Sequence, residues 1–135
     1  MKSVIAVLSG FFTVFVASIA TDQLFHVLNV YPPWGEPMWS PWLNLLALSY
    51  RTIYAMAGGF VTASLAPRAP MRHVHVLAGI GTLLAILGAV FAITQANLGP
   101  VWYPVLLAVT SYPAVWFGGR TRHGSSSRPH RGAIR

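Results

Sequence analysis

The stretch VLAGIGTLLAILGAVFAIT, residues Val76 to Thr94, contains 19 residues and no charged side chain. An α-helix rises 1.5 Å per residue, so about 20 apolar residues cross the ~30 Å hydrocarbon core of a bilayer. Lipid offers no partners to backbone N–H and C=O groups, and a helix pairs these groups internally. The stretch therefore predicts a membrane-spanning helix.

Three further apolar runs lie outside this stretch. The run from Val4 to Ala20 carries no charge and resumes, after a short polar break, as far as Val30. The run from Leu43 to Leu65 is interrupted by one arginine, and the run from Val101 to Phe117 contains two prolines. We expect an all-α integral membrane protein, a four-helix bundle made of two helical hairpins. Its single domain covers residues 1–119, with spans over about 4–30, 43–65, 74–94 and 101–118.

The composition of the 135-residue chain agrees with this expectation. Hydrophobic residues make up 55% of the chain and charged residues 8%, whereas soluble domains carry about 25% charged residues. This balance argues against a water-soluble monomer. The chain has no cysteine, and it contains no phosphate-binding glycine motif, nucleophile elbow, zinc-protease motif or close pair of carboxylates. We therefore expect neither an enzyme nor a bound cofactor or metal.

The charges predict the orientation in the membrane. Eight basic residues fall on one side of the predicted spans, and the opposite side carries Glu36 without any Lys or Arg. The positive-inside rule then places both termini of a multi-pass membrane protein in the cytoplasm. The basic residues are Lys2, Arg68, Arg72, Arg120, Arg122, Arg128, Arg131 and Arg135.

The first apolar run could also be interpreted as a secretory signal, because Ser18-Ile19-Ala20 has the small-x-small form of a cleavage site. Its apolar stretch exceeds the 7 to 15 residues usual for a signal core. We expect the first helix to be retained.

The tail from Arg120 to Arg135 has no apolar periodicity and predicts a disordered segment. Its arginines are expected to attract anionic lipid headgroups. Nucleic-acid binding is not expected, because the tail lacks aromatic side chains for base stacking. The predicted headgroup contacts are Arg68, Arg72, Arg120 and Arg122.

Two charged residues fall inside the predicted spans, where a charge costs ~2.5 to 3.5 kcal/mol. Asp22 lies eight residues before the first turn and Arg51 eight residues after it, so an antiparallel hairpin places both at the same depth. We expect them to form an ion pair. His26, Gln23 and Asn44 lie on or beside the same helix faces and are expected to join the polar network.

Two interpretations of this intramembrane polar site remain open. The pair could fix the helix register and do nothing else. Alternatively, it could form a site open to the periplasmic side, in which Asp22 and His26 exchange protons or bind a cation and Arg51 acts as counter-ion.

The segment YPPWGEPMWSPW, residues Tyr31 to Trp42, combines four prolines with four aromatic residues. It predicts a stiff aromatic belt at the outer interface of the membrane, or alternatively a lid over the polar site. The belt would comprise Tyr31, Trp34, Trp39, Trp42, Trp102 and Tyr103.

Small residues also recur on one face of the third predicted helix, at Gly81, Ala85, Gly88 and Ala92. Small residues let membrane helices approach closely. We expect this face to pack inside the bundle, with a homo-oligomer contact as the alternative.

Two segments, TDQLFHVLNVYPPWG (Thr21 to Gly35) and SYRTIYAMAGGFVTASLAPR (Ser49 to Arg68), resemble a group of small bacterial four-span inner-membrane proteins. The resemblance extends over most of the chain outside the tail. It implies the four-span architecture and a location in the bacterial inner (plasma) membrane. The group has no known activity and therefore carries no functional residues over to this chain.

The sequence thus favours a structural or accessory membrane subunit built around the Asp22 to Arg51 pair. Its expected partners are the lipid bilayer and either a second copy or a larger membrane complex. The alternative is a small solute or proton-linked transporter with a polar site facing the periplasm.

Overall fold

The computed structural model describes residues 1–126, and every regular element in that range is helical. Helix α1 covers Lys2–Val27, α2 Pro41–Leu65, α3 Pro70–Phe91 and α4 Trp102–Ser126. A π-helical segment, Ala92–Ala96, continues α3. Two of these helices, α1 and the continuous helix Pro70–Ala96, are long and apolar enough to cross a membrane.

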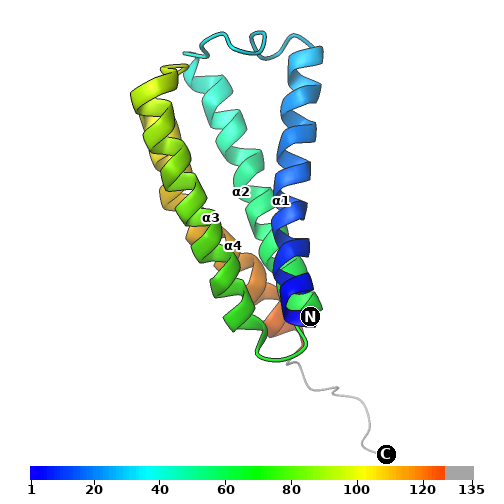
Figure 1. Ribbon diagram of the computed structural model, residues 1–135. Helices are drawn as coiled ribbons and strands as arrows, with labels where there is room; N and C mark the ends of the chain where they lie inside the picture. Colours follow the sequence, from blue (N-terminus) through cyan, green and yellow to red (C-terminus); the bar gives the residue numbers. More distant parts are fainter. Residues whose placement is uncertain (127–135) are drawn as a thin grey trace, which may run out of the picture.

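The four helices run alternately up and down (Figure 1). The α1–α2 and α3–α4 connections lie at one end, which we call the loop end, while the N-terminus and the α2–α3 connection lie at the other, the basic end (Figure 1). Helix α2 packs against α1 and α4, and α4 packs against α3, so two antiparallel hairpins form the bundle.

Glycines bring the helices together in the half of the bundle near the basic end. A Cβ atom on Gly10 of α1 would lie 2.6 Å from the carbonyl oxygen of Gly58 in α2, and one on Gly118 of α4 would lie 1.8 Å from that of Met56. Only residues without a side chain permit such backbone contacts. The helices therefore converge at the basic end, while α1 and α3 diverge toward the loop end (Figure 1).

The first helix ends earlier than its predicted span. Helix α1 stops at Val27 rather than continuing to Val30, and Asn29 adopts a left-handed conformation with φ of 57°. Asparagine tolerates this region better than most residues, so it suits the point where the chain turns away from the helix.

The tail predicted to be disordered from Arg120 onward is helical as far as Ser126. The Arg120 guanidinium lies 5.2 Å from the centre of the Trp116 ring, and Arg122 Nε donates a hydrogen bond of 3.1 Å to Ser64 Oγ on α2. These contacts hold the end of α4 in the helical conformation. The rest of the predicted tail, residues 127–135, lies outside the described residues.

Candidate functional site

The Asp22 carboxylate on α1 accepts hydrogen bonds from two consecutive residues of α2. The Tyr50 hydroxyl donates to Oδ1, and Arg51 Nη2 donates to Oδ2 and forms an ion pair with it. The structure therefore brings Asp22 and Arg51 together across the α1–α2 hairpin, as their distances from the turn predict.

Two tyrosines that the sequence analysis did not assign to the site complete this network. Tyr31, from the α1–α2 connection, donates a hydrogen bond of 3.1 Å to the Tyr50 hydroxyl, which in turn donates to Asp22. Burial raises the pKa of Tyr31, although the hydrogen bond with Tyr50 opposes that shift. Its phenol therefore remains protonated, and able to donate, at neutral pH.

Arg51 has more donors than the described contacts use. A guanidinium carries five N–H groups, and among the described residues its buried Nε has no hydrogen-bond partner. The side chain keeps 30% of its surface exposed and lines a cleft inside the bundle. Both Asp22 oxygens are engaged, whereas Asp22 uses one of the five Arg51 N–H groups and the side chain is partly exposed, so the polar site has capacity for an additional acceptor.

His26 and Gln23 do not join this network, contrary to the expectation from their positions on α1. His26 Nδ1 lies 2.6 Å from the carbonyl oxygen of Pro32, and its ring packs against Trp34 with centroids 4.0 Å apart. Gln23 Oε1 accepts a hydrogen bond of 3.0 Å from Trp34 Nε1. These side chains bind the α1–α2 connection, residues 28–40, which we call the strap.

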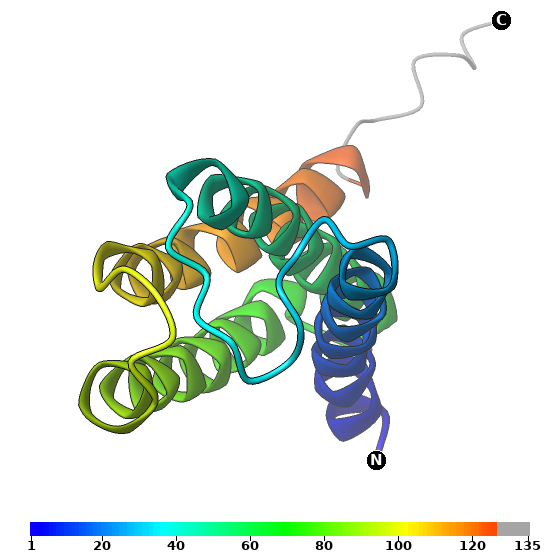
Figure 2. The same cartoon turned by 90° about the horizontal axis from the view of Figure 1, so that it is seen from above.

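Asn44 also forms hydrogen bonds with the strap rather than with Asp22 or Arg51. Its buried Nδ2 donates to the carbonyl oxygens of Met38 and Ser40, at 3.0 and 2.9 Å. The backbone N–H of Met38 donates to the carbonyl oxygen of Leu98 at 2.6 Å, which fastens the strap to the α3–α4 connection. The strap thus crosses the loop end of the bundle, as seen from above in Figure 2.

The predicted aromatic belt separates into two groups. Trp34, Trp39 and Trp42 are 62%, 56% and 78% exposed, whereas Tyr31 is only 5% exposed. Tyr103 packs against the cluster around Tyr31 and Tyr50 and lines the cleft. Tyr31 is therefore an interior residue rather than a belt residue, and Tyr103 is partly buried beside it. Trp102 is partly buried, with its ring edge-on to that of Tyr103.

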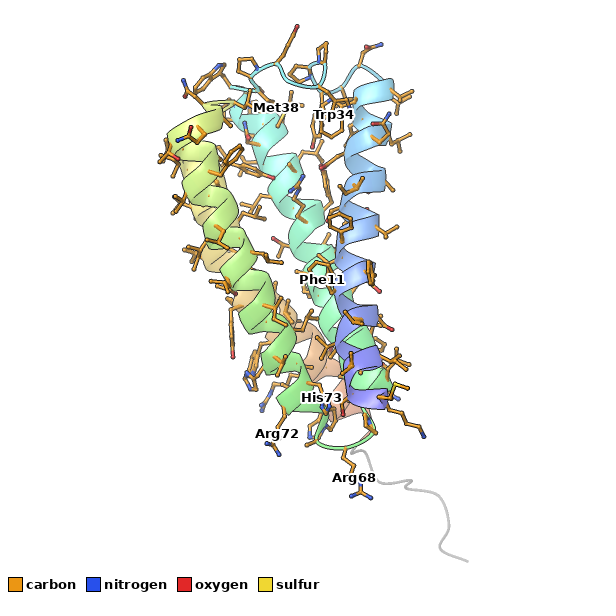
Figure 3. The ribbon with its side chains drawn as sticks, viewed as in Figure 1. Phe11, Trp34, Met38, Arg68, Arg72 and His73 are labelled. Carbon is orange, nitrogen blue, oxygen red and sulfur yellow. The ribbon has the colours of Figure 1, made fainter. Side chains whose placement is uncertain are left out.

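The cleft has a volume of about 660 Å³ and lies among all four helices. Its wall on α1 runs from Phe11 to Asp22, and Figure 3 shows Phe11 on the side of α1 that faces α3. Asp22 and Arg51 line the part of the cleft nearest the strap, together with Asn44 and other polar groups. The remaining lining is mostly apolar and includes Val14, Phe15, Ile19, Leu77, Leu84 and Leu107.

The small residues of α3 do not make the close helix contact that their spacing predicts. Gly81, Ala85, Gly88 and Ala92 all line the cleft. A Cβ atom on Gly81 would lie 3.6 Å from Ser111 Oγ, and one on Gly88 would meet no atom of the described chain within 4 Å. The small side chains leave space on this face because α3 diverges from α1 there.

The predicted headgroup contacts gather at the basic end. Arg68 and Arg72 lie on either side of the start of α3, both exposed (Figure 3). Arg120 is exposed and Arg122 is partly buried at the end of α4. Glu36, in the strap, is exposed at the loop end, so the two ends differ in the sign of their charge.

No group of three His, Cys, Asp or Glu side chains within residues 1–126 is arranged to hold a metal ion. No known protein family, curated protein or solved structure matches the chain.

Proposed function

We propose that the chain is a four-span integral membrane protein. Helices α1 and Pro70–Ala96 have the length and composition of spans, and α2 and α4, each of 25 residues, pack antiparallel beside them. If α1 and the helix Pro70–Ala96 cross a bilayer, then α2 and α4, which pack along them, cross it too. The positive charge near Arg68, Arg72, Arg120 and Arg122 then places both termini in the cytoplasm.

In the proposed topology, the exposed tryptophans lie at one membrane–water interface. Trp34, Trp39 and Trp42 lie at the loop end, which corresponds to the periplasmic interface of a bacterial inner membrane. Exposed indole rings favour this boundary, because they combine an apolar ring with a polar N–H group.

Within this membrane protein, the cleft serves as a binding site for a small ligand. The observation that carries the proposal is a space of about 660 Å³ whose lining includes both charged residues of the bundle interior. Ligand sites typically occupy ~300 to 1,000 Å³ and combine apolar walls with a few polar groups. A purely structural ion pair requires no such space, so the cleft supports binding or transport over a structural subunit.

The roles proposed for the two charged residues are the reverse of those in the transporter hypothesis from sequence. Asp22 already accepts from Tyr50 and Arg51, which supports a role as the counter-ion that positions the guanidinium. Arg51 lines the cleft with N–H groups beyond the one that donates to Asp22, and it is the residue that contacts the ligand. A site of this kind selects a hydrogen-bond acceptor rather than a cation.

Purification of the full chain from its own membranes in mild detergent, followed by native mass spectrometry, tests this function. Binding predicts a small-molecule adduct at one copy per chain. Gly88→Leu should remove the adduct, because its side chain enters the cleft. Gly79→Leu on the same helix should retain it, because Gly79 is exposed and lies outside the cleft lining. A stoichiometric protein partner without any adduct would instead favour the accessory subunit.

A further inference from the structure

The cleft is closed at both of its ends. Toward the basic end, a Cβ atom on Gly10 would lie 2.9 Å from Leu77 Cδ2, so α1 and α3 meet there. Toward the loop end, the strap is fastened to the α3–α4 connection by the hydrogen bond between Met38 and Leu98. A Cβ atom on Gly99 would lie 2.9 Å from the Met38 carbonyl oxygen, so little room remains between the two connections.

The height of the cleft limits what can occupy it. Along α1 its lining extends from Phe11 to Asp22, and along the facing helix from Leu77 to Ile93. At 1.5 Å per residue these walls are about 16 and 24 Å long. A helix that spans the membrane needs about 30 Å of unobstructed length. The contact at Gly10 and the strap block such a helix, so the occupant is neither a second copy of this chain nor a helix of a partner protein. It is a shorter molecule.

The cleft opens sideways, between α1 and α3. Its lining includes Phe15 and Ile19 on α1, which are 51% and 49% exposed, and Leu84 and Ile93 on α3, which are 48% and 43% exposed. In the proposed topology this opening faces the hydrocarbon core of the bilayer. A ligand that enters there is already dissolved in the membrane, so much of its surface is apolar.

The polar groups at the strap end define the head of that ligand. The two Asp22 oxygens accept from Tyr50 and Arg51, and the Arg51 side chain, which is 30% exposed, lines the cleft. A guanidinium carries five N–H groups, so donors beyond the one that binds Asp22 are available to an incoming oxygen. The site is therefore complementary to an acceptor such as a carbonyl or carboxylate oxygen.

We propose that the cleft binds one single-chain amphipath from the bilayer, with its apolar tail between α1 and α3 and its terminal acyl oxygen at Arg51. The proposal rests on the proposed function and specifies its ligand class. A free fatty acid and a neutral fatty ester share this chemistry, and the experiment below distinguishes them. The apolar walls hold the tail, while Arg51 distinguishes the acyl head from a plain hydrocarbon.

The test uses the full chain in lipid nanodiscs with three photoreactive probes of equal chain length. The probes are an analogue of palmitic acid, its methyl ester and a hydrocarbon without a head. We expect at least one acyl probe to label cleft residues such as Phe15 and Leu84 about tenfold more than the hydrocarbon does, the difference expected for one hydrogen bond to a charged donor. Preference for the acid indicates a charged head, and preference for the ester a neutral one.

Three variants test whether the probes bind in the cleft. Gly88→Leu should reduce labelling of the cleft by every probe about tenfold, while Gly79→Leu leaves it unchanged. Arg51→Lys keeps a positive charge beside Asp22 but removes the guanidinium and its additional N–H donors, so it should abolish the preference for acyl probes without reducing labelling by the hydrocarbon. The comparison among the three probes in the wild-type chain does not depend on the folding of any variant.

Failure of the ligand proposal and failure of the binding function give different experimental results. Equal labelling of the cleft by all three probes overturns the acyl-head proposal and leaves the binding function standing. Labelling confined to the outer helix faces, together with a small-molecule adduct in native mass spectrometry, also overturns the ligand class alone. The same labelling pattern without any adduct overturns the binding function as well.

Discussion

Replacement of Asp22 by asparagine tests the energetic role of the ion pair. The change removes the negative charge but leaves an oxygen that can accept from Tyr50. Arg51 then remains partly buried without its counter-charge, a change that costs about 3 to 5 kcal/mol for fully buried pairs. Because Arg51 is 30% exposed, we expect the free energy of unfolding to fall by about 2 to 3 kcal/mol.

Reversible unfolding in mixed micelles, followed by far-ultraviolet circular dichroism, measures this loss. Glu36 provides a matched control, because the chain contains two acidic residues and Glu36 is the exposed one in the strap. Glu36→Gln should change the unfolding free energy by no more than about 0.5 kcal/mol.

The double variant Asp22→Asn with Arg51→Gln completes the cycle. It replaces both charges by neutral amides, so its stability should return to within about 1 kcal/mol of the wild type. Strictly additive losses would refute the coupling between the two residues. An Asp22→Asn variant as stable as Glu36→Gln would refute the claim that the charge is buried.

Three other substitutions test the packing and the strap. Gly58→Leu should destabilise the bundle by more than about 3 kcal/mol, because a Cβ atom there would lie 2.3 Å from Val14 Cγ2, while Gly79→Leu should have little effect on the unfolding midpoint. Trp34→Ala removes the ring that packs on His26, so hydrogen exchange at strap amides should accelerate about tenfold with little change in global stability. Asn44→Leu loses both hydrogen bonds that its side chain donates to strap carbonyls and should cost about 1 to 3 kcal/mol, measured by the same unfolding assay.

The helices can be predicted from the sequence because each of them corresponds to a continuous apolar run. Long runs without charge give the number and order of the elements, and the equal distances of Asp22 and Arg51 from the first turn indicate their ion pair. The helix ends are less accessible from sequence. The last turns of α4 depend partly on the contact of Arg122 with Ser64 of α2, a residue that the sequence does not place beside it.

The cleft could not be predicted, because it depends on where the helices separate. Gly58 and Gly88 have the same side chain, yet Gly58 packs against the α1 backbone and Gly88 borders open space. Helical periodicity places both residues on inward faces but does not show which face meets a neighbour. In the same way, His26 shares a helix face with Asp22, and only the path of the strap explains why it contacts Pro32 instead.

An experimental density map of the wild-type chain, extracted from its own membranes into nanodiscs, tests the central claim most directly. The account predicts elongated density between α1 and α3 that ends within hydrogen-bond distance of the Arg51 guanidinium. Helices α1 and α3 packed against each other from Gly10 to the strap, with no space between them, would contradict it.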